Sequence, residues 1–481
     1  MPKPKNHQRQ SSGAPSKKEV VEDRSLPQLQ QALDPQVMSP AFEKFFSREY
    51  PDRKLKVVRF HVGKVNHKPG KECSIIYGVL CSGKGDDGLP LGNWFYGTMS
   101  ANGAQHAETT ANAPSTWPGC RFWRPVSYWP EFDMLLYAFP YDPELPHLGM
   151  LAELEFVKSK IQANLENLEL APEWQCRQIH GDLIKYMPGK RCVFRYDLML
   201  THPSGEQRQM TIFGKTYETA HSRYVFEVLR KIHGSPACTS GVLNIPRPVA
   251  HIDEANTLLQ LAWEGENLSR LADQFGWANL PSTGLMPKIA AMLAGLHQIP
   301  ITDLALKSGV SPVRLLENAY GDAADIHRHL PHYQEKLSDL VATLAATKPN
   351  ASELKLQTTI HGTFKIAQIL CRDDRLALVD FDSVALGDPH YDLAEFLASL
   401  VFLQISDNVP AAALGESVEQ FLQAYQHAVP WVCDRRRIAW YLAAFLLGKI
   451  HSALKRLESE AGQNVAAAFA LVNDWLKVAA G

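Results

Sequence analysis

The stretch that decides the fold reads Ile360-His361-Gly362-Thr363-Phe364-Lys365-Ile366-Ala367-Gln368-Ile369-Leu370, and Leu378-Val379-Asp380-Phe381-Asp382 follows it. Asp380 comes directly after a short apolar run, which predicts a strand over 376–379, and Asp382 comes two residues later. Magnesium is held in proteins by one or two carboxylates together with phosphate and water. The end of this strand is therefore a candidate metal site, and the alternative is a pair of turn residues.

Two further segments, Gly387-Asp388-Pro389 and Asp392-Leu393-Ala394, complete the series. Together the four segments resemble the aminoglycoside phosphotransferase and choline kinase family, which shares the protein-kinase fold. In that family the first segment reads His-Gly-Asp, four residues, Asn. Here Thr363 stands in place of the Asp and Gln368 in place of the Asn. The resemblance covers roughly residues 173–481.

The resemblance implies roles for the residues of this loop. The family's Asp accepts the proton of the substrate hydroxyl, which Thr363 cannot do as a carboxylate does. Gln368 keeps an amide oxygen on a longer stem, so the resemblance implies a metal set of Asp380, Gln368 and Asp382. Lys365 stands where many protein kinases carry a lysine that contacts the transferred phosphate, and an ordinary loop lysine is the alternative. His361 is expected to brace the loop rather than to react.

A lysine and a glutamate of the preceding region match the nucleotide-binding pair of the kinase fold. Lys215 ends a predicted strand, and Glu227 lies twelve residues later on an amphipathic helix. Kinase-like enzymes need a cation on the ATP phosphates and a carboxylate that holds it in place. The Pro188-Gly189-Lys190-Arg191 turn adds Lys190, either above the phosphates or at a solvated hairpin tip. His180-Gly181-Asp182 spells the family's triplet but precedes the strand, so it is assigned a structural role.

An internal repeat organises the first half of the chain. Residues 68–77 match 187–196 at an offset of 119, and Arg124-Pro125-Val126 matches Arg247-Pro248-Val249 at an offset of 123. Each copy predicts an antiparallel unit that begins with a Pro-Gly turn. The first copy has Thr98 at the position of Lys215, and a poor helix follows over 101–118. It is interpreted as a degenerate N-lobe that serves as a cap or an interaction surface.

The predicted fold class is α+β, a protein-kinase-like bilobal fold with an antiparallel-sheet N-lobe and a mostly helical C-lobe, preceded by a degenerate duplicate of the N-lobe. The C-lobe helices are expected near 287–299, 313–346, 391–404, 415–428, 435–458 and 463–478. The expected domains are a disordered tail over 1–40, an N-lobe-like cap domain over 41–147, a helical linker over 148–172, the N-lobe over 173–262 and the C-lobe over 263–481.

Composition narrows the class of protein. A formal charge of -2 predicts no general attraction to nucleic acid or to an anionic membrane. The eight cysteines are scattered without a Cys-x-x-Cys pair, which disfavours structural zinc and a disulfide framework and favours the cytoplasm. The longest apolar run, 438–447, is about half of what a bilayer span needs.

The sequence leaves two functions open. The first is an atypical kinase that transfers phosphate from ATP, with Mg²⁺, to a hydroxyl of a small molecule. The second is a pseudokinase that binds nucleotide or a protein partner without efficient transfer. The altered Thr363 and Gln368 favour the second, and the retained Lys215 and Asp380 favour the first.

Overall fold

The computed structural model describes residues 23–84, 90–101, 109–110, 112–120, 122–300, 302, 305–456 and 464–481. Its contacts divide the chain into two compact units. The N-terminal unit contains the described residues up to Ser222, Val249–Leu259 and a short stretch from Lys455. The C-terminal unit contains Arg223–Pro248, Gln260–Leu454 and the C-terminal helix.

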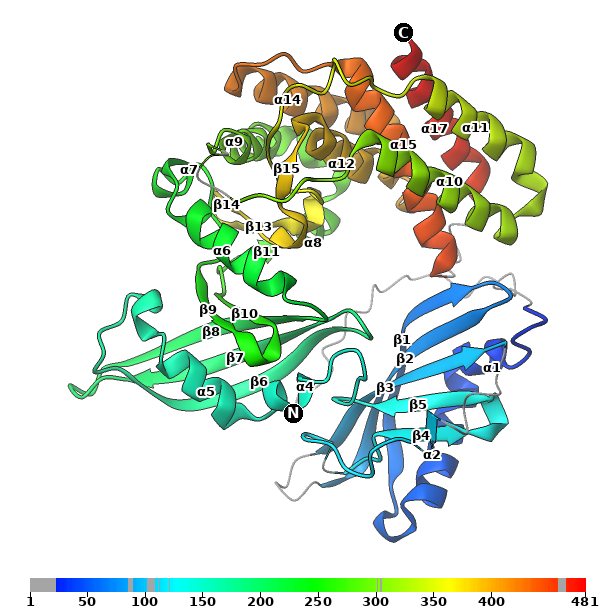
Figure 1. Cartoon of the computed structure of the whole chain (residues 1–481), viewed down its shortest axis with the longest axis vertical. Coiled ribbons are helices and arrows are strands. Elements are labelled where there is room, and N and C mark those ends of the chain that lie inside the picture. Colours follow the sequence, from blue (N-terminus) through cyan, green and yellow to red (C-terminus); the bar gives the residue numbers. More distant parts are fainter. Residues whose placement is uncertain are drawn as a thin grey trace. The chain divides into compact units, whose positions relative to one another are not determined.

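The first sheet of the N-terminal unit has five strands in the order β1-β2-β3-β5-β4 (Figure 1). They are β1 (Lys56–Lys68), β2 (Glu72–Lys84), β3 (Pro90–Ser100), β4 (Val126–Trp129) and β5 (Met134–Ala138), and all their pairings are antiparallel. Helices α1 (Leu29–Leu33) and α2 (Pro35–Glu49) precede the sheet. Helix α2 begins because Asp34 accepts a hydrogen bond from the Gln36 amide and Pro35 fixes the first turn. Its buried residues Phe42 and Phe46, one turn apart, join the core of this sheet.

The second sheet has the same strand order, β6-β7-β8-β10-β9. Its strands are β6 (Gln175–Met187), β7 (Arg191–Thr201), β8 (Gln207–Tyr217), β9 (Pro248–Ile252) and β10 (Thr257–Leu261), and helices α4 (Leu148–Ala152) and α5 (Leu154–Gln162) precede them. The strand registers also correspond. Ile75 pairs with Gly97 in the first sheet, and Phe194 pairs with Gly214 at the matching place in the second.

Contacts outside the strands repeat at the same offset. The Tyr77 hydroxyl donates to the Ala32 carbonyl at 2.9 Å, and 119 positions later the Tyr196 hydroxyl donates to the Leu151 carbonyl at 2.9 Å. Asp142 accepts from the amide of the glycine in the Pro-Gly turn, Gly189, at 2.8 Å. Asp23, 119 positions earlier, accepts from the amide of the equivalent glycine, Gly70, at 2.9 Å. That the two halves arose by duplication stays an interpretation of the sequence.

These correspondences change two expected boundaries. Residues 29–40, which the sequence assigns to a disordered tail, lie in α1 and α2, because their apolar side chains pack on the first sheet. The expected linker over 148–172 contains α4 and α5, which precede the second sheet as α1 and α2 precede the first. Residues 102–108 and 111 of the segment 101–118, which was expected to be a poor helix, lie outside the described residues.

The C-terminal unit is mostly helical. Its helices are α6 (His221–His233, of which the first two residues belong to the other unit), α7 (Pro236–Thr239), α8 (Leu268–Phe275), α9 (Leu285–His297), α10 (Pro312–His329), α11 (Gln334–Ala346), α12 (Pro389–Val401), α13 (Leu403–Ser406), α14 (Ala411–Ala428), α15 (Arg435–Lys455) and α17 (Val465–Ala480). In the described part of the chain, none of the helices combines the length and the hydrophobicity that a bilayer crossing requires. The antiparallel sheets and the helical unit agree with the predicted α+β class.

Two small sheets of the C-terminal unit position the 361–368 loop and the turn that carries Asp380. Strand β12 (Thr358–Ile360) pairs with β15 (Ala385–Gly387), and β13 (Ile369–Arg372) pairs with both β14 (Arg375–Leu378) and β11 (Glu266–Asn267). The loop 361–368 therefore leaves one sheet and ends at the other. The turn that carries Asp380 leaves β14 and leads to β15, so both segments lie between the same two sheets.

Candidate active site

The 361–368 loop is fastened to helix α12 by one carboxylate. Asp392 accepts hydrogen bonds from the backbone amides of His361 at 2.6 Å and Gly362 at 2.8 Å. Its Oδ2 atom also lies 3.1 Å from His297 Nε2, on α9. Both Asp392 and His297 have fully buried side chains, so solvent does not compete for these bonds. Asp392 therefore braces the loop.

A second layer supports this brace. The other ring nitrogen of His297 lies 2.6 Å from the hydroxyl of Tyr425, on α14. The backbone turn at Gly362 has a φ of 78°, a conformation that glycine adopts without steric cost. The sequence places His297 and Tyr425 on helices but gives no sign that they meet Asp392. That contact depends on how α9 and α14 pack.

Thr363 takes part in a chain of neutral hydrogen bonds. His361 Nε2 lies 3.1 Å from the Val379 carbonyl, which can only accept, so this nitrogen carries the hydrogen. His361 Nδ1 is then the acceptor for the Thr363 hydroxyl at 3.4 Å, and Gln368 Nε2 donates to the same hydroxyl oxygen at 3.3 Å. Burial lowers the pKa of His361, and the charges of Asp392 and Asp380 oppose this without outweighing it. The loop thus has a neutral network at the place of the missing carboxylate.

The two candidate metal carboxylates lie where the sequence predicts them, after strand β14. Asp380 has the left-handed conformation, with φ 73° and ψ 52°, and Asp382 follows in a short 3-10 helix, Phe381–Ser383. A non-glycine residue in this region is uncommon and often marks a functional site. Both carboxylates are close enough to act on the charge of His361.

The donor set fits magnesium better than a transition metal. Among the described residues there is no cluster of three or more His, Cys, Asp or Glu that would hold a metal unaided. Two carboxylates and an amide oxygen suit Mg²⁺ when phosphate oxygens complete the shell. Gln368 Oε1 already accepts from the Lys365 amide at 3.1 Å, so it would offer its second lone pair.

The expected phosphate-binding residues are found on the second sheet and on α6. Lys215 is half-buried in β8, opposite Val193 of β7. Glu227 lies on α6 with 61% of its side chain exposed, 4.0 Å from Arg223. The role of Glu227 in holding Lys215 stays a prediction.

Lys190 is exposed in the turn between β6 and β7, where positive charge gathers. Burial lowers the pKa of the Lys64 ammonium, and the charges of Arg456, Lys185, Arg191 and Lys190 lower it further. Such a cluster attracts anions. The role of Lys190 at the hairpin tip stays a prediction.

Helix α12 contributes one residue that sequence reasoning missed. Glu395 follows Asp392 by three residues and therefore lies one helical turn along. Its Oε2 atom is buried without a hydrogen-bond partner in the described part of the chain. Lys365 of the loop and Lys449 of α15 are the positive charges that act on it.

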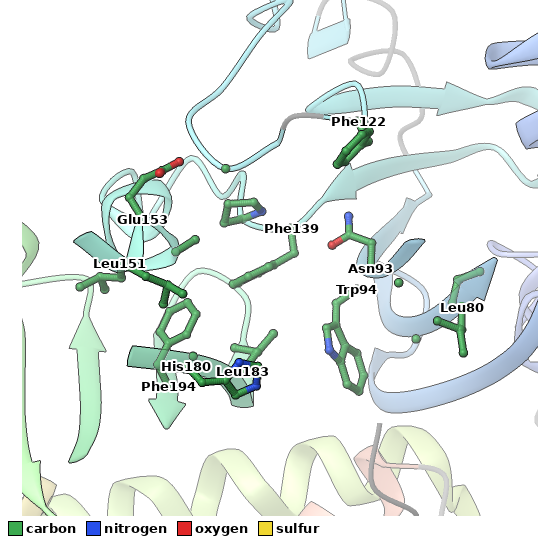
Figure 2. Close-up of a pocket in the computed structure, with 18 of the residues that line it drawn as sticks. Leu80, Asn93, Trp94, Phe122, Phe139, Leu151, Glu153, His180, Leu183 and Phe194 are labelled. Atoms are coloured by element: carbon green, nitrogen blue, oxygen red, sulfur yellow. The ribbon is translucent and has the colours of Figure 1, made fainter. Parts of the chain in front are cut away.

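The N-terminal unit contains a cavity of its own, of about 520 Å³ (Figure 2). Trp94 of the first sheet and Phe194 of the second line it, together with Phe139, whose ring centroid is 6.0 Å from that of Phe194. His180, of the His-Gly-Asp triplet on β6, is part of its wall with 57% of its side chain exposed. The 361–368 loop belongs to the other unit, so this cavity and the loop are built independently.

The comparisons with known proteins point to one family. Residues 211–441 match the model of a phosphotransferase enzyme family. No curated protein matches the chain. Solved structures that resemble it include an aminoglycoside phosphotransferase from Streptomyces rimosus, with 18% identity, a TM-score of 0.37 and coverage of 56% of this chain and 92% of that one.

Two other similar structures have choline kinase or choline/ethanolamine kinase in their names. Choline kinase from Cryptosporidium parvum has 11% identity and a TM-score of 0.43, and the match covers 67% of this chain and 95% of that one. A choline/ethanolamine kinase family protein from Mesorhizobium loti has 14% identity and a TM-score of 0.40, with coverage of 68% and 99%. The family model that residues 211–441 match and these similar structures, which are aminoglycoside phosphotransferases and choline kinases, share a protein-kinase-like fold.

Proposed function

We propose that the protein is a kinase that transfers the γ-phosphoryl group of ATP to a hydroxyl of a small molecule, with Mg²⁺ as the metal. The observation that carries this proposal is the brace of the 361–368 loop. Asp392 holds the amides of His361 and Gly362, and the Asp380 carboxylate lies near His361. A loop kept in position beside metal-binding carboxylates is what phosphoryl transfer requires, since it depends mostly on positioning and charge.

Each residue then has a defined task. Lys215 and Lys190 would bind the phosphates, with Glu227 orienting Lys215. Asp380 and Asp382 would hold Mg²⁺ with help from Gln368, and the metal would neutralise phosphate charge. Lys365 would offset charge that develops on the transferred group. His361 keeps the loop rigid through its buried hydrogen bonds and does not exchange a proton with substrate.

Thr363 does not provide the general base that this reaction would use. A threonine hydroxyl does not accept a proton at neutral pH, and here it already accepts from Gln368 and donates to His361. A general base contributes about 10²–10⁴ in rate. The protein would therefore be slow unless another carboxylate takes the proton.

A pseudokinase is the alternative. Gln368 favours it, because both its amide oxygen and its amide nitrogen are engaged inside the loop. Such a protein would bind nucleotide or a protein partner without turnover. A cytoplasmic location is part of either proposal, and neither involves nucleic acid or membrane.

The test is ATP binding followed by turnover. We expect ATP to raise the melting temperature of the wild type only when Mg²⁺ is present, and Lys215→Ala and Asp380→Ala to abolish this rise. ADP formation from MgATP would then establish the kinase, and magnesium-dependent binding without ADP formation would select the pseudokinase. The absence of any shift in the wild type would contradict both. Lys336→Ala, at a lysine of α11 outside the site, is the control and should keep the wild-type shift.

A further inference from the structure

Helix α12 presents two carboxylates to the 361–368 loop, and the proposed function so far uses one. Asp392 binds the backbone of the loop. Glu395 lies three residues on, so its side chain leaves the same face of the helix one turn later. The rings of Phe364 and Phe396 lie 5.2 Å apart, which places this turn of α12 against the part of the loop between Thr363 and Lys365.

The environment of Glu395 is unusual for a glutamate. Its Oε2 atom has no hydrogen-bond partner among the described residues, although it is buried. An unsatisfied buried acceptor destabilises a protein, and more so if it is charged, so each one calls for an explanation. Asp392 already holds the backbone of the loop in place. An acceptor without a partner in the described part of the chain can take a hydrogen bond from a donor that the protein itself lacks, such as a substrate hydroxyl.

The charges around Glu395 support a role in proton transfer. Burial raises its pKa to about 8, the positive charge of Lys365 opposes this rise, and the negative charge of Asp392 adds to it. A general base works best when its pKa lies near the working pH. Lys365, the residue placed to contact the transferred phosphate, is also the charge that acts most strongly on Glu395. The base and the phosphate-binding cation would then share one site.

We propose that Glu395 Oε2 accepts the proton of the acceptor hydroxyl, in place of the aspartate missing at position 363. This inference rests on the proposed kinase function. As the acceptor oxygen forms its bond to the γ-phosphorus, its proton passes to Glu395. The bond between that phosphorus and the bridging oxygen breaks, and its electron pair leaves with ADP. Glu395 later returns the proton to solvent.

The experiment measures ADP formation from MgATP, with water and glycerol as acceptors. Four proteins are compared: the wild type, Glu395→Gln, Thr363→Asp and the double variant. Glu395→Gln keeps the shape of the side chain and should lose about 10²–10⁴ in rate while it binds MgATP as the wild type does. Thr363→Asp restores a carboxylate on the loop, so the double variant should keep the rate of Thr363→Asp. Glu416→Gln, an exposed glutamate of α14, is the matched control.

The outcomes separate this inference from the proposed function. Glu395→Gln at the wild-type rate overturns the inference and leaves the kinase standing. A double variant as slow as Glu395→Gln, with Thr363→Asp fast, also overturns it, because Glu395 would then be structural. If the wild type is silent and Thr363→Asp is active, the nucleotide site works but Glu395 is not its base. If neither turns over MgATP, the kinase function itself fails.

Discussion

Replacement of Asp392 by asparagine changes one atom of the carboxylate that fastens the 361–368 loop. The carboxylate accepts from the His361 amide at 2.6 Å, the Gly362 amide at 2.8 Å and His297 Nε2 at 3.1 Å. Asparagine has one acceptor oxygen, so its amide group must face at least one of these donors. Hydrogen bonds to a charged group contribute about 1.5–3 kcal/mol, and a buried donor left unsatisfied costs about 1–3 kcal/mol. The expected loss of unfolding free energy is about 3–5 kcal/mol.

Urea denaturation of the wild type and Asp392→Asn measures this loss, with the slope of the transition as a check on the denatured state. The control is Asp474→Asn on α17, whose carboxylate is 66% exposed and lies 2.9 Å from Lys477. An exposed pair of this kind contributes well under 1 kcal/mol, so the control should unfold like the wild type. A loss of less than about 1 kcal/mol in Asp392→Asn at an unchanged slope would refute the assigned brace.

Three further variants test other parts of the structure. Gly362→Ala should lower the melting temperature strongly, because a β-carbon there would overlap a backbone carbonyl and the backbone is left-handed, whereas Gly321→Ala in open space on α10 should raise it slightly. Asp142→Asn removes an acceptor of the Pro-Gly turn and should cost about 1–3 kcal/mol in urea denaturation, and an unchanged midpoint would argue against the turn contact. Burial raises the pKa of Asp388, but the hydrogen bonds from His390 and the positive charges of His390 and Arg437 together outweigh this, and the net pKa is below its ordinary value of 3.8. The stability it contributes is present above that value and lost as pH falls below it, so acid denaturation curves of the wild type and Asp388→Asn should converge below about pH 4.

Much of the fold follows from patterns that can be seen in the sequence. The predicted helices over 391–404, 415–428, 435–458 and 463–478 correspond to α12, α14, α15 and α17. The one predicted over 313–346 is two helices, α10 and α11, because Pro331 disfavours helical dihedrals at Leu330, which has φ −134° and ψ 71°. Periodicity predicts that such a segment is helical, but a single proline decides where it breaks.

The sequence predicts which residues of the candidate site lie in its motifs, but it does not predict which residues from other elements contact them. The places of His361, Asp380 and Asp392 follow from their motifs. Glu395 does not, because a glutamate in the middle of a helix is usually a solvated charge, and only the packing of α12 against the loop buries its Oε2 atom. The helical structure of residues 29–40 was not predicted for a similar reason. Their composition is largely polar, and their few apolar side chains stabilise helices only because they pack on the first sheet.

The two similar halves of the N-terminal unit raise a problem of correct pairing during folding. Each helix pair receives a tyrosine hydroxyl from its own sheet, Tyr77 at Ala32 and Tyr196 at Leu151, so the backbone bonds would accept either helix pair on either sheet. Side-chain size prevents this exchange. Phe42 of α2 packs among six aromatic rings. Ile161 of α5, the residue 119 positions later, is aliphatic and equally buried. A swapped arrangement would leave a void in one core and overfill the other, each at a cost of about 1–5 kcal/mol. The difference in side-chain size between the two halves thus disfavours their misassembly.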